Sequence, residues 1–149
     1  MKNNRLTQVI AFGIMLVSLA IGAKAYAEDI TVYKSPTCGC CSNWVDYLRE
    51  EGFTVKTHNM SVLTGIKAQF GLTDERLMSC HTAIVDGYVV EGHVPVQDIR
   101  RLVAEKPDII GVSAPGMPQL SPGMGSRIPK NYNVVSFDKN GTIDLFSMY

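Results

Sequence analysis

Residues 35–42 read Ser35-Pro36-Thr37-Cys38-Gly39-Cys40-Cys41-Ser42, which places three of the chain's four cysteines within four positions. Cys38 and Cys41 have the C-x-x-C spacing of a dithiol redox site at the start of a helix. Cys38 and Cys40 are separated by one residue, and Cys40 directly precedes Cys41. Thiolates crowded in this way suit a soft metal ion better than a stable structural disulfide. The stretch therefore predicts thiol redox chemistry, soft-metal binding or both.

The segments on either side of these cysteines predict a strand, a helix and a second strand. Residues 30–33 are β-branched and aromatic, and Pro36 prevents further pairing. From residue 41 to residue 51 the apolar side chains follow a helical period, and Gly52 stands where a left-handed C-cap is favoured. Residues 53–58 alternate as a strand does. Because the connection is a short helical crossover, the two strands are predicted to be parallel.

The middle of the chain predicts two more helices and a hairpin. Asp86-Gly87 joins two β-like runs, which is a strong hairpin signal. A short helical turn is expected at residues 73–77. Ser61 is the expected N-cap of a helix whose apolar face carries Val62, Leu63, Ile66 and Phe70. Pro95 suits the first turn of a third helix, whose inward side chains are expected to be Val96, Ile99, Leu102 and Val103.

Residues 111–130 predict a long loop of functional importance. Four glycines alternate with four prolines in this segment, and Met117 and Met124 lie among them. After the loop, residues 134–137 and 142–146 are β-like, and Asn140-Gly141 between them predicts a second hairpin.

This order of elements predicts an α/β fold that resembles thioredoxin: a mixed sheet flanked by helices, here with an extra C-terminal hairpin. In that fold, a loop that usually carries a cis-proline before a threonine packs against the cysteine pair. The corresponding residues here are His81 and Thr82, directly after Cys80, and no proline stands at that place. Cys80 and His81 are therefore expected to face the cysteine cluster and to convert a redox dithiol into a metal pocket.

The cysteines themselves favour copper over other soft-metal centres. At a helix N-terminus, free N–H groups and the helix dipole stabilise the thiolates of Cys40 and Cys41. Thiolates bind Cu(I), Zn²⁺ or iron–sulfur centres, but a structural zinc site needs two separated pairs of ligands. One tight triplet with a remote fourth cysteine suits Cu(I) better, so the predicted ligands are Cys38, Cys40, Cys41 and Cys80. The competing interpretation of Cys80 is a buried structural thiol beside a surface histidine.

Three further residues are candidate ligands with a plainer alternative. His93 follows the hairpin, where a lone histidine is commonly an exposed loop residue. The thioethers of Met117 and Met124 suit Cu(I) and are poor ligands for zinc, although methionine also fills gaps in packing. Whether His81 is a ligand stays open.

The first 27 residues are predicted to be a secretory signal peptide. Lys2 and Arg5 precede an uncharged apolar run at residues 9–22, and Ala25-Tyr26-Ala27 supplies the pattern that signal peptidase cuts. The alternative is an uncleaved N-terminal anchor.

After cleavage, residues 28–149 form one domain with 11 basic and 14 acidic residues, which predicts neither nucleic acid nor a membrane as partner. In an oxidising compartment, a disulfide-stapled module is a further alternative.

Taken together, the motifs resemble the exported copper-resistance family called CopG-like, a thioredoxin-like group of proteins of unknown function. The matching stretches are residues 36–41, 80–82, 91–95, 114–118 and 121–124. The resemblance implies copper binding in the periplasm, with a role in copper redox handling during copper stress. It also implies that His93, Met117 and Met124 belong to the pocket.

The first hypothesis is an exported copper-binding protein of copper resistance that holds Cu(I) and couples Cu(I)/Cu(II) conversion to thiol redox state. Other exported copper-handling proteins are its expected partners. The alternative is a thiol–disulfide oxidoreductase acting on exported proteins, with Cys38 and Cys41 as the catalytic pair. The sequence leaves open whether the protein turns over as an enzyme and how many copper ions it binds.

Overall fold

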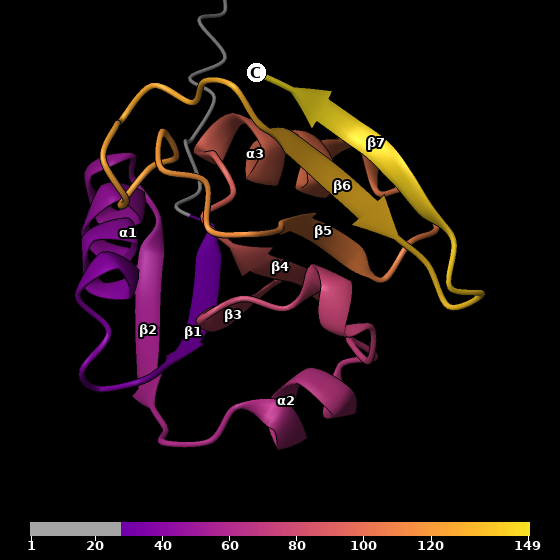
Figure 1. Cartoon of the computed structure of the whole chain (residues 1–149), viewed down its shortest axis with the longest axis horizontal. Coiled ribbons are helices and arrows are strands. Elements are labelled where there is room, and N and C mark those ends of the chain that lie inside the picture. The colour runs from indigo at the N-terminus through magenta and orange to yellow at the C-terminus, as the bar shows by residue number, and fades with distance from the viewer. Residues whose placement is uncertain (1–27) are drawn as a thin grey trace, which may run out of the picture.

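A computed structural model describes residues 28–149 of the chain, and the predicted signal peptide lies outside these residues. The described part forms a seven-stranded sheet with three α-helices and one short 3-10 helix (Figure 1). The strands are β1 Asp29–Lys34, β2 Thr54–Asn59, β3 His81–Val85, β4 Tyr88–Gly92, β5 Gly111–Ala114, β6 Asn133–Phe137 and β7 Ile143–Met148. The helices are α1 Gly39–Glu50, α2 Thr64–Gln69, η1 Glu75–Leu77 and α3 Val96–Glu105.

The sheet is mixed, with the strand order β2-β1-β3-β4-β5-β6-β7. β1 pairs in parallel with β2, as the sequence predicted, and in antiparallel with β3. β4 pairs in antiparallel with β3 and in parallel with β5, and the predicted C-terminal hairpin β6–β7 extends the sheet beyond β5. The structure therefore confirms an α/β fold with a mixed sheet, in which strands outnumber helices.

The larger hydrophobic core lies between the sheet and the helices α1 and α3. Strand residues alternate between two faces, and Ile30 and Val32 of β1 belong to this core together with Trp44 and Leu48 of α1. As predicted, α3 buries Val96, Ile99 and Leu102, while Val103 is only partly buried. A smaller core formed by Leu72, Leu77, Val89 and Phe137 takes the side chains that point to the opposite face of the sheet.

The prediction of one continuous loop over residues 111–130 is wrong at its start, because residues 111–114 form the strand β5. All four residues of β5 are buried between β4 and β6. A Cβ atom on Gly111 would lie 2.0 Å from the carbonyl oxygen of Val89, so only glycine fits at this close approach of two strands. The glycine that indicated a loop is in fact required by strand pairing.

The predicted helix after Ser61 is also shorter than expected and docks differently. α2 begins at Thr64, Leu63 is its N-cap, and no side chain caps it. Val62, expected on the apolar face, is 67% exposed, whereas the buried residue of α2 is Lys67. The helix therefore docks on the sheet through a buried cation. Within residues 28–149, no helix is long and apolar enough to cross a membrane.

Candidate metal centre

The start of α1 holds the C-x-x-C pair. Cys38 is the N-cap of the helix, and its sulfur accepts the backbone N–H of Cys41 at 3.3 Å. Cys38 and Cys41 form a disulfide in this structure, with their Cα atoms 5.3 Å apart. Cys41 is fully buried, whereas Cys38 and Cys40 are half-buried, so one edge of the pair is open to solvent.

Cys80 lies against this pair, as the sequence predicted. Its sulfur is 3.1 Å from the sulfur of Cys41, and the sulfurs of Cys38 and Cys40 are 3.5 Å apart. The four cysteine sulfurs all lie within 4.8 Å of one another, and we call Cys38, Cys40, Cys41 and Cys80 the sulfur cluster. Cys40 and Cys80 are free thiols.

Strand pairing explains why Cys80 arrives there. β1 ends at Lys34, directly before the cysteine loop, and Lys34 pairs with His81 at the start of β3. The residue before His81 must therefore lie beside the loop that carries the other cysteines. Residues 38 and 80 are far apart in sequence, and the antiparallel register of β1 and β3 brings them together.

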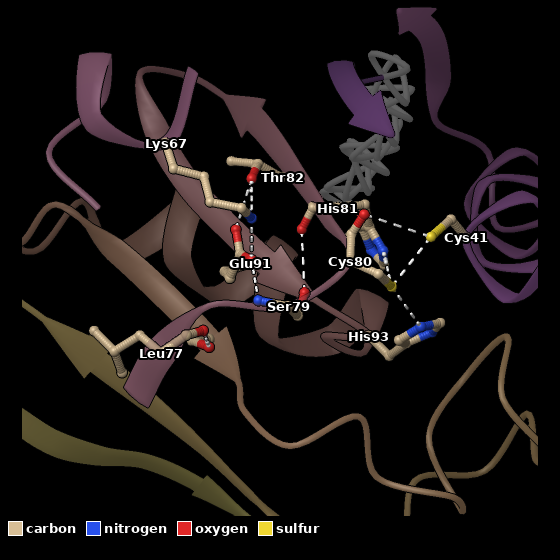
Figure 2. Close-up of polar contacts among 10 residues, drawn as sticks. Cys41, Lys67, Leu77, Ser79, Cys80, His81, Thr82, Glu91 and His93 are labelled. Carbon is tan, nitrogen blue, oxygen red and sulfur yellow. Dashed lines mark hydrogen bonds and ion pairs between the residues drawn. The ribbon is translucent and has the colours of Figure 1, made fainter. Parts of the chain in front are cut away.

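Two histidines lie behind the sulfur cluster, and both are fully buried. The Nδ1 of His81 is 3.5 Å from the sulfur of Cys80, and the Nε2 of His93 is 4.0 Å from the same sulfur (Figure 2). Cys80, His81 and His93 form a second group whose ligand atoms lie within 4.8 Å of one another. The two candidate groups share Cys80, so the structure presents one continuous set of sulfur and nitrogen donors.

The tautomer of His93 follows from its hydrogen bond. A carbonyl oxygen can only accept, so the Nδ1 of His93 carries the proton that it donates to the carbonyl of Pro122 at 2.7 Å. The Nε2 atom then has a free lone pair toward Cys80. The ring of His81 packs against that of Trp44 with centroids 4.6 Å apart and planes tilted by 38°, and its Nε2 is buried without a hydrogen-bond partner in the described part of the chain.

Burial has the largest effect on the pKa values of Cys80, His81 and His93. It raises the pKa of the Cys80 thiol to about 12, and the neighbouring Cys40 adds to the rise. Burial lowers the pKa of His93, and it lowers the pKa of His81 well below its ordinary value, with His93 contributing. Both imidazoles are therefore neutral near pH 7 and keep a lone pair for a metal ion, while Cys80 must lose a proton to bind one.

The loop after β5 carries Met117 and Met124, and we call its residues 115–130 the methionine loop. It contacts His93 and α1 through its backbone. The Pro122 carbonyl makes the bond to His93, and a Cβ atom on Gly123 would lie 2.7 Å from the backbone nitrogen of Trp44. Met117 and Met124 are both half-buried, and Met124 lines a cavity together with Asn43 of α1. The loop therefore covers the start of α1, and neither thioether takes part in the contact that joins it to His93.

Comparison with known proteins relates this arrangement to copper resistance. Two solved structures are similar, described as copper resistance protein CopG in form 2 and in form 1. Each is 36% identical in sequence, covers 83% of this chain and has a TM-score of 0.75. The alignment spans 99% of the form 2 chain and 98% of the form 1 chain.

The chain belongs to the CopG family. The family resemblance expected from the sequence motifs is thereby confirmed. A family model described as a protein of unknown function, DUF411, matches residues 77–124, which include Cys80, His81 and His93 but not the C-x-x-C pair. A search of curated proteins finds no match to this chain.

Sequence reasoning missed several residues that shape this member of the CopG family. The sequence indicated Trp44 only as one of the apolar side chains at helical spacing in residues 41–51. Its ring packs against the ring of His81, and its indole N–H donates to the carbonyl of Val94 at 3.0 Å. The buried pair Lys67–Glu91 was not foreseen. A signal was present, because Lys67 falls at the i+4 position from Leu63 on the stripe predicted to be apolar.

Proposed function

We propose that this protein is an exported copper-binding protein that holds Cu(I) in the sulfur cluster as its cargo. The observation that carries the proposal is the convergence of four cysteine sulfurs within 4.8 Å. Soft thiolates at such spacing select Cu(I) over harder divalent ions. The two similar solved structures are both described as copper resistance protein CopG, which supports the same metal.

The imidazoles of His93 and His81 complete the donor set in this proposal. His93 was expected as a ligand, and its free Nε2 lone pair faces the sulfur of Cys80. His81 was left open on sequence grounds, and its Nδ1 lies 3.5 Å from the sulfur of Cys80, which supports it as a second nitrogen ligand. Met117 and Met124 remain proposed as soft ligands or as part of the loop that covers the site.

In this proposal, the redox state of Cys38 and Cys41 controls how tightly the protein binds Cu(I). When Cys38 and Cys41 form their disulfide, two of the four sulfurs are no longer thiolates, and Cu(I) binding weakens. When the disulfide is reduced by two electrons and two protons, both sulfurs become ligands. In the reverse direction the dithiol passes one electron to each of two Cu(II) ions, releases two protons and yields two Cu(I) ions and the disulfide.

We also propose that the first four strands form a thioredoxin-like core. The order β2-β1-β3-β4, with β3 antiparallel to its neighbours, supports this proposal. The C-x-x-C pair begins the helix after β1, and His81-Thr82 occupies the place where thioredoxin-like proteins usually carry a cis-proline. Residues 28–149 contain no cis peptide bond.

The signal peptide at residues 1–27 and a periplasmic location stay predictions, and so does transfer of copper to other exported copper-handling proteins.

The second candidate function is a thiol–disulfide oxidoreductase. The Cys38–Cys41 disulfide at the N-terminus of α1 favours it, because such disulfides exchange with partner thiols. Fast reduction of a protein disulfide by the dithiol form, with weak Cu(I) uptake, would favour this function over copper binding.

An anaerobic Cu(I) titration tests the copper proposal. The reduced protein competes with a chromophoric Cu(I) chelator, and free thiols are counted before and after loading. Tight uptake should consume at least about three thiols, and Cys40→Ser should weaken it by about tenfold or more, since it removes a ligand but keeps the C-x-x-C pair. Weak uptake by the wild-type protein would refute the copper function.

A further inference from the structure

A buried ion pair lies directly behind the segment that carries Cys80 and His81. Lys67 is 4% exposed and Glu91 is fully buried, and the Nζ of Lys67 is 2.5 Å from the Oε1 of Glu91. No cysteine or histidine takes part in this pair, and the copper proposal gives it no role.

Glu91 binds both ends of this segment. Its Oε1 accepts the backbone N–H of Ser79 at 2.5 Å, and its Oε2 accepts the hydroxyl of Thr82 at 2.7 Å (Figure 2). The two residues between them are Cys80 and His81. Lys67 also donates to the hydroxyl oxygen of Thr82 at 2.8 Å, so all three side chains form one closed network. We call Lys67, Thr82 and Glu91 the clamp.

The clamp and the sulfur cluster lie on opposite sides of the same strand. Thr82 and Glu91 are cross-strand partners in β3 and β4, so their side chains share one face of the sheet, on which Lys67 of α2 docks. Side chains alternate along a strand, so His81 points to the other face, toward Trp44. Figure 2 shows Lys67, Thr82 and Glu91 on one side and Cys41 and His93 on the other. The clamp therefore acts through the backbone of residues 79–82, the bend at the entry to β3, which we call the turn.

Other contacts show how tightly this turn is held. The hydroxyl of Ser79 donates to the carbonyl of His81 at 3.2 Å, and the hydroxyl of Ser113 donates to the carbonyl of Leu77 at 2.7 Å. Gly92 has a φ of +74°, and a Cβ atom there would lie 2.9 Å from the hydroxyl oxygen of Ser79. These contacts, together with the clamp, fix the chain where it enters β3.

We propose that Lys67, Thr82 and Glu91 are positioning residues that hold Cys80 and His81 in place for metal capture. A contribution to stability does not by itself explain why Lys67 and Glu91 form a buried ion pair, because apolar residues of similar volume often replace such a pair without loss of stability. A polar network behind metal ligands, in contrast, commonly sets their orientation and tunes affinity. This role rests on the proposed Cu(I) function: the clamp would orient Cys80 and His81 before the ion binds.

Two double variants remove both charges of the ion pair, but only one of them also removes the hydrogen bonds that hold Ser79 and Thr82. Comparing them separates the effect of these hydrogen bonds from the effect of the charges. In Lys67→Met with Glu91→Gln, the amide can still accept the Ser79 N–H and donate to the hydroxyl oxygen of Thr82. In Lys67→Met with Glu91→Leu, both anchors of the turn are lost, while the volume is similar and no buried charge is left unpaired. Thr82→Val is a milder variant that keeps the ion pair and removes one anchor.

The first readout needs no copper. Hydrogen–deuterium exchange of the peptide covering residues 78–82 is measured in the purified, copper-free proteins, with β6–β7 peptides as internal reference. Exchange should be about tenfold faster in the leucine double variant, intermediate in Thr82→Val and within about threefold of wild type in the glutamine double variant. Equal local exchange in all folded variants would overturn the clamp, and if the leucine double variant does not fold, Thr82→Val decides.

The second readout is Cu(I) affinity by chelator competition in the reduced proteins. The leucine double variant should bind about tenfold or more weakly, and the glutamine double variant should keep near wild-type affinity. Wild-type affinity in a folded leucine double variant would overturn the positioning role. If the wild-type protein itself does not bind Cu(I), the copper function fails, and the exchange experiment alone then decides whether the clamp orders the turn.

Discussion

Cys80 is the residue at which the two donor groups meet. Its sulfur is 3.1 Å from that of Cys41, 3.5 Å from the Nδ1 of His81 and 4.0 Å from the Nε2 of His93. Burial and the nearby Cys40 raise the pKa of its thiol to about 12, so the copper-free protein holds it protonated near pH 7. A metal ion that binds there must displace this proton.

The raised pKa gives a prediction for alkylation of Cys80 in the unreduced protein. Only the thiolate reacts, so the rate should rise about tenfold for each pH unit from pH 7 to pH 10 without a plateau. Mass spectrometry after timed iodoacetamide treatment measures the rate at Cys80. A synthetic peptide of residues 77–84 is the control, and its rate should level off above a pH of about 8.5. A plateau below pH 10 in the folded protein would contradict the raised pKa.

The positions of β5 and α2 in the fold do not depend on apolar side chains alone. β5 lies between β4 and β6, and Gly111 leaves no room for a side chain against the carbonyl of Val89. The buried residue of α2 is a lysine, and this helix packs on the sheet through the ion pair between Lys67 and Glu91. Hydrophobic periodicity therefore missed β5, and it predicted a helix at α2 but not that its buried side chain is a lysine.

Substitution of Gly111 tests the importance of this approach. Gly111→Ala should destabilise the protein by about 3 kcal/mol or more, because the added methyl group forces β4 and β5 apart. The free energy of unfolding is measured in urea. Gly65→Ala is the matched control, because among residues 28–149 no atom other than its chain neighbours and the backbone of α2 lies within 4 Å of its Cβ position. This variant should be neutral or stabilising by up to about 1 kcal/mol. A Gly111→Ala protein as stable as wild type would show that the strands separate without cost.

At the scale of the whole molecule, the sulfur cluster and the C-terminal hairpin lie toward opposite ends of the sheet. β1 and β3 bring the sulfur cluster together, and the β6–β7 hairpin lies at the other end of the strand order. The hairpin docks on α3, where the buried Asp98 accepts the hydroxyls of Ser147 and Tyr149 at 2.5 and 2.8 Å. Arg101 also donates to the carbonyl of Phe146 at 2.6 Å.

This division predicts that hairpin docking affects stability without affecting the metal centre. Tyr149→Phe leaves one oxygen of the buried Asp98 without its donor, and it should cost about 1–3 kcal/mol in the free energy of unfolding measured in urea. Cu(I) affinity of the reduced variant should equal that of the wild-type protein. A loss of copper affinity in the folded variant would mean that the two ends of the sheet are coupled.

The sequence by itself determined the cysteine spacing, the two hairpins, the helix that begins at the cysteines and the family. These features are local, because turn residues, periodicity and short motifs express them within a few positions. The expectation that Cys80 and His81 face the cluster also came from the sequence, through the resemblance to a known fold.

Only the tertiary structure decided what depends on contacts between distant segments. It placed residues 111–114 in a strand, because the pairing partners of Gly111 lie in β4 and β6. It buried Lys67 against Glu91, and it joined the methionine loop to His93 through the carbonyl of Pro122. Backbone carbonyls and cross-strand partners carry no mark in the sequence, since every residue has a carbonyl and register is set by the whole sheet.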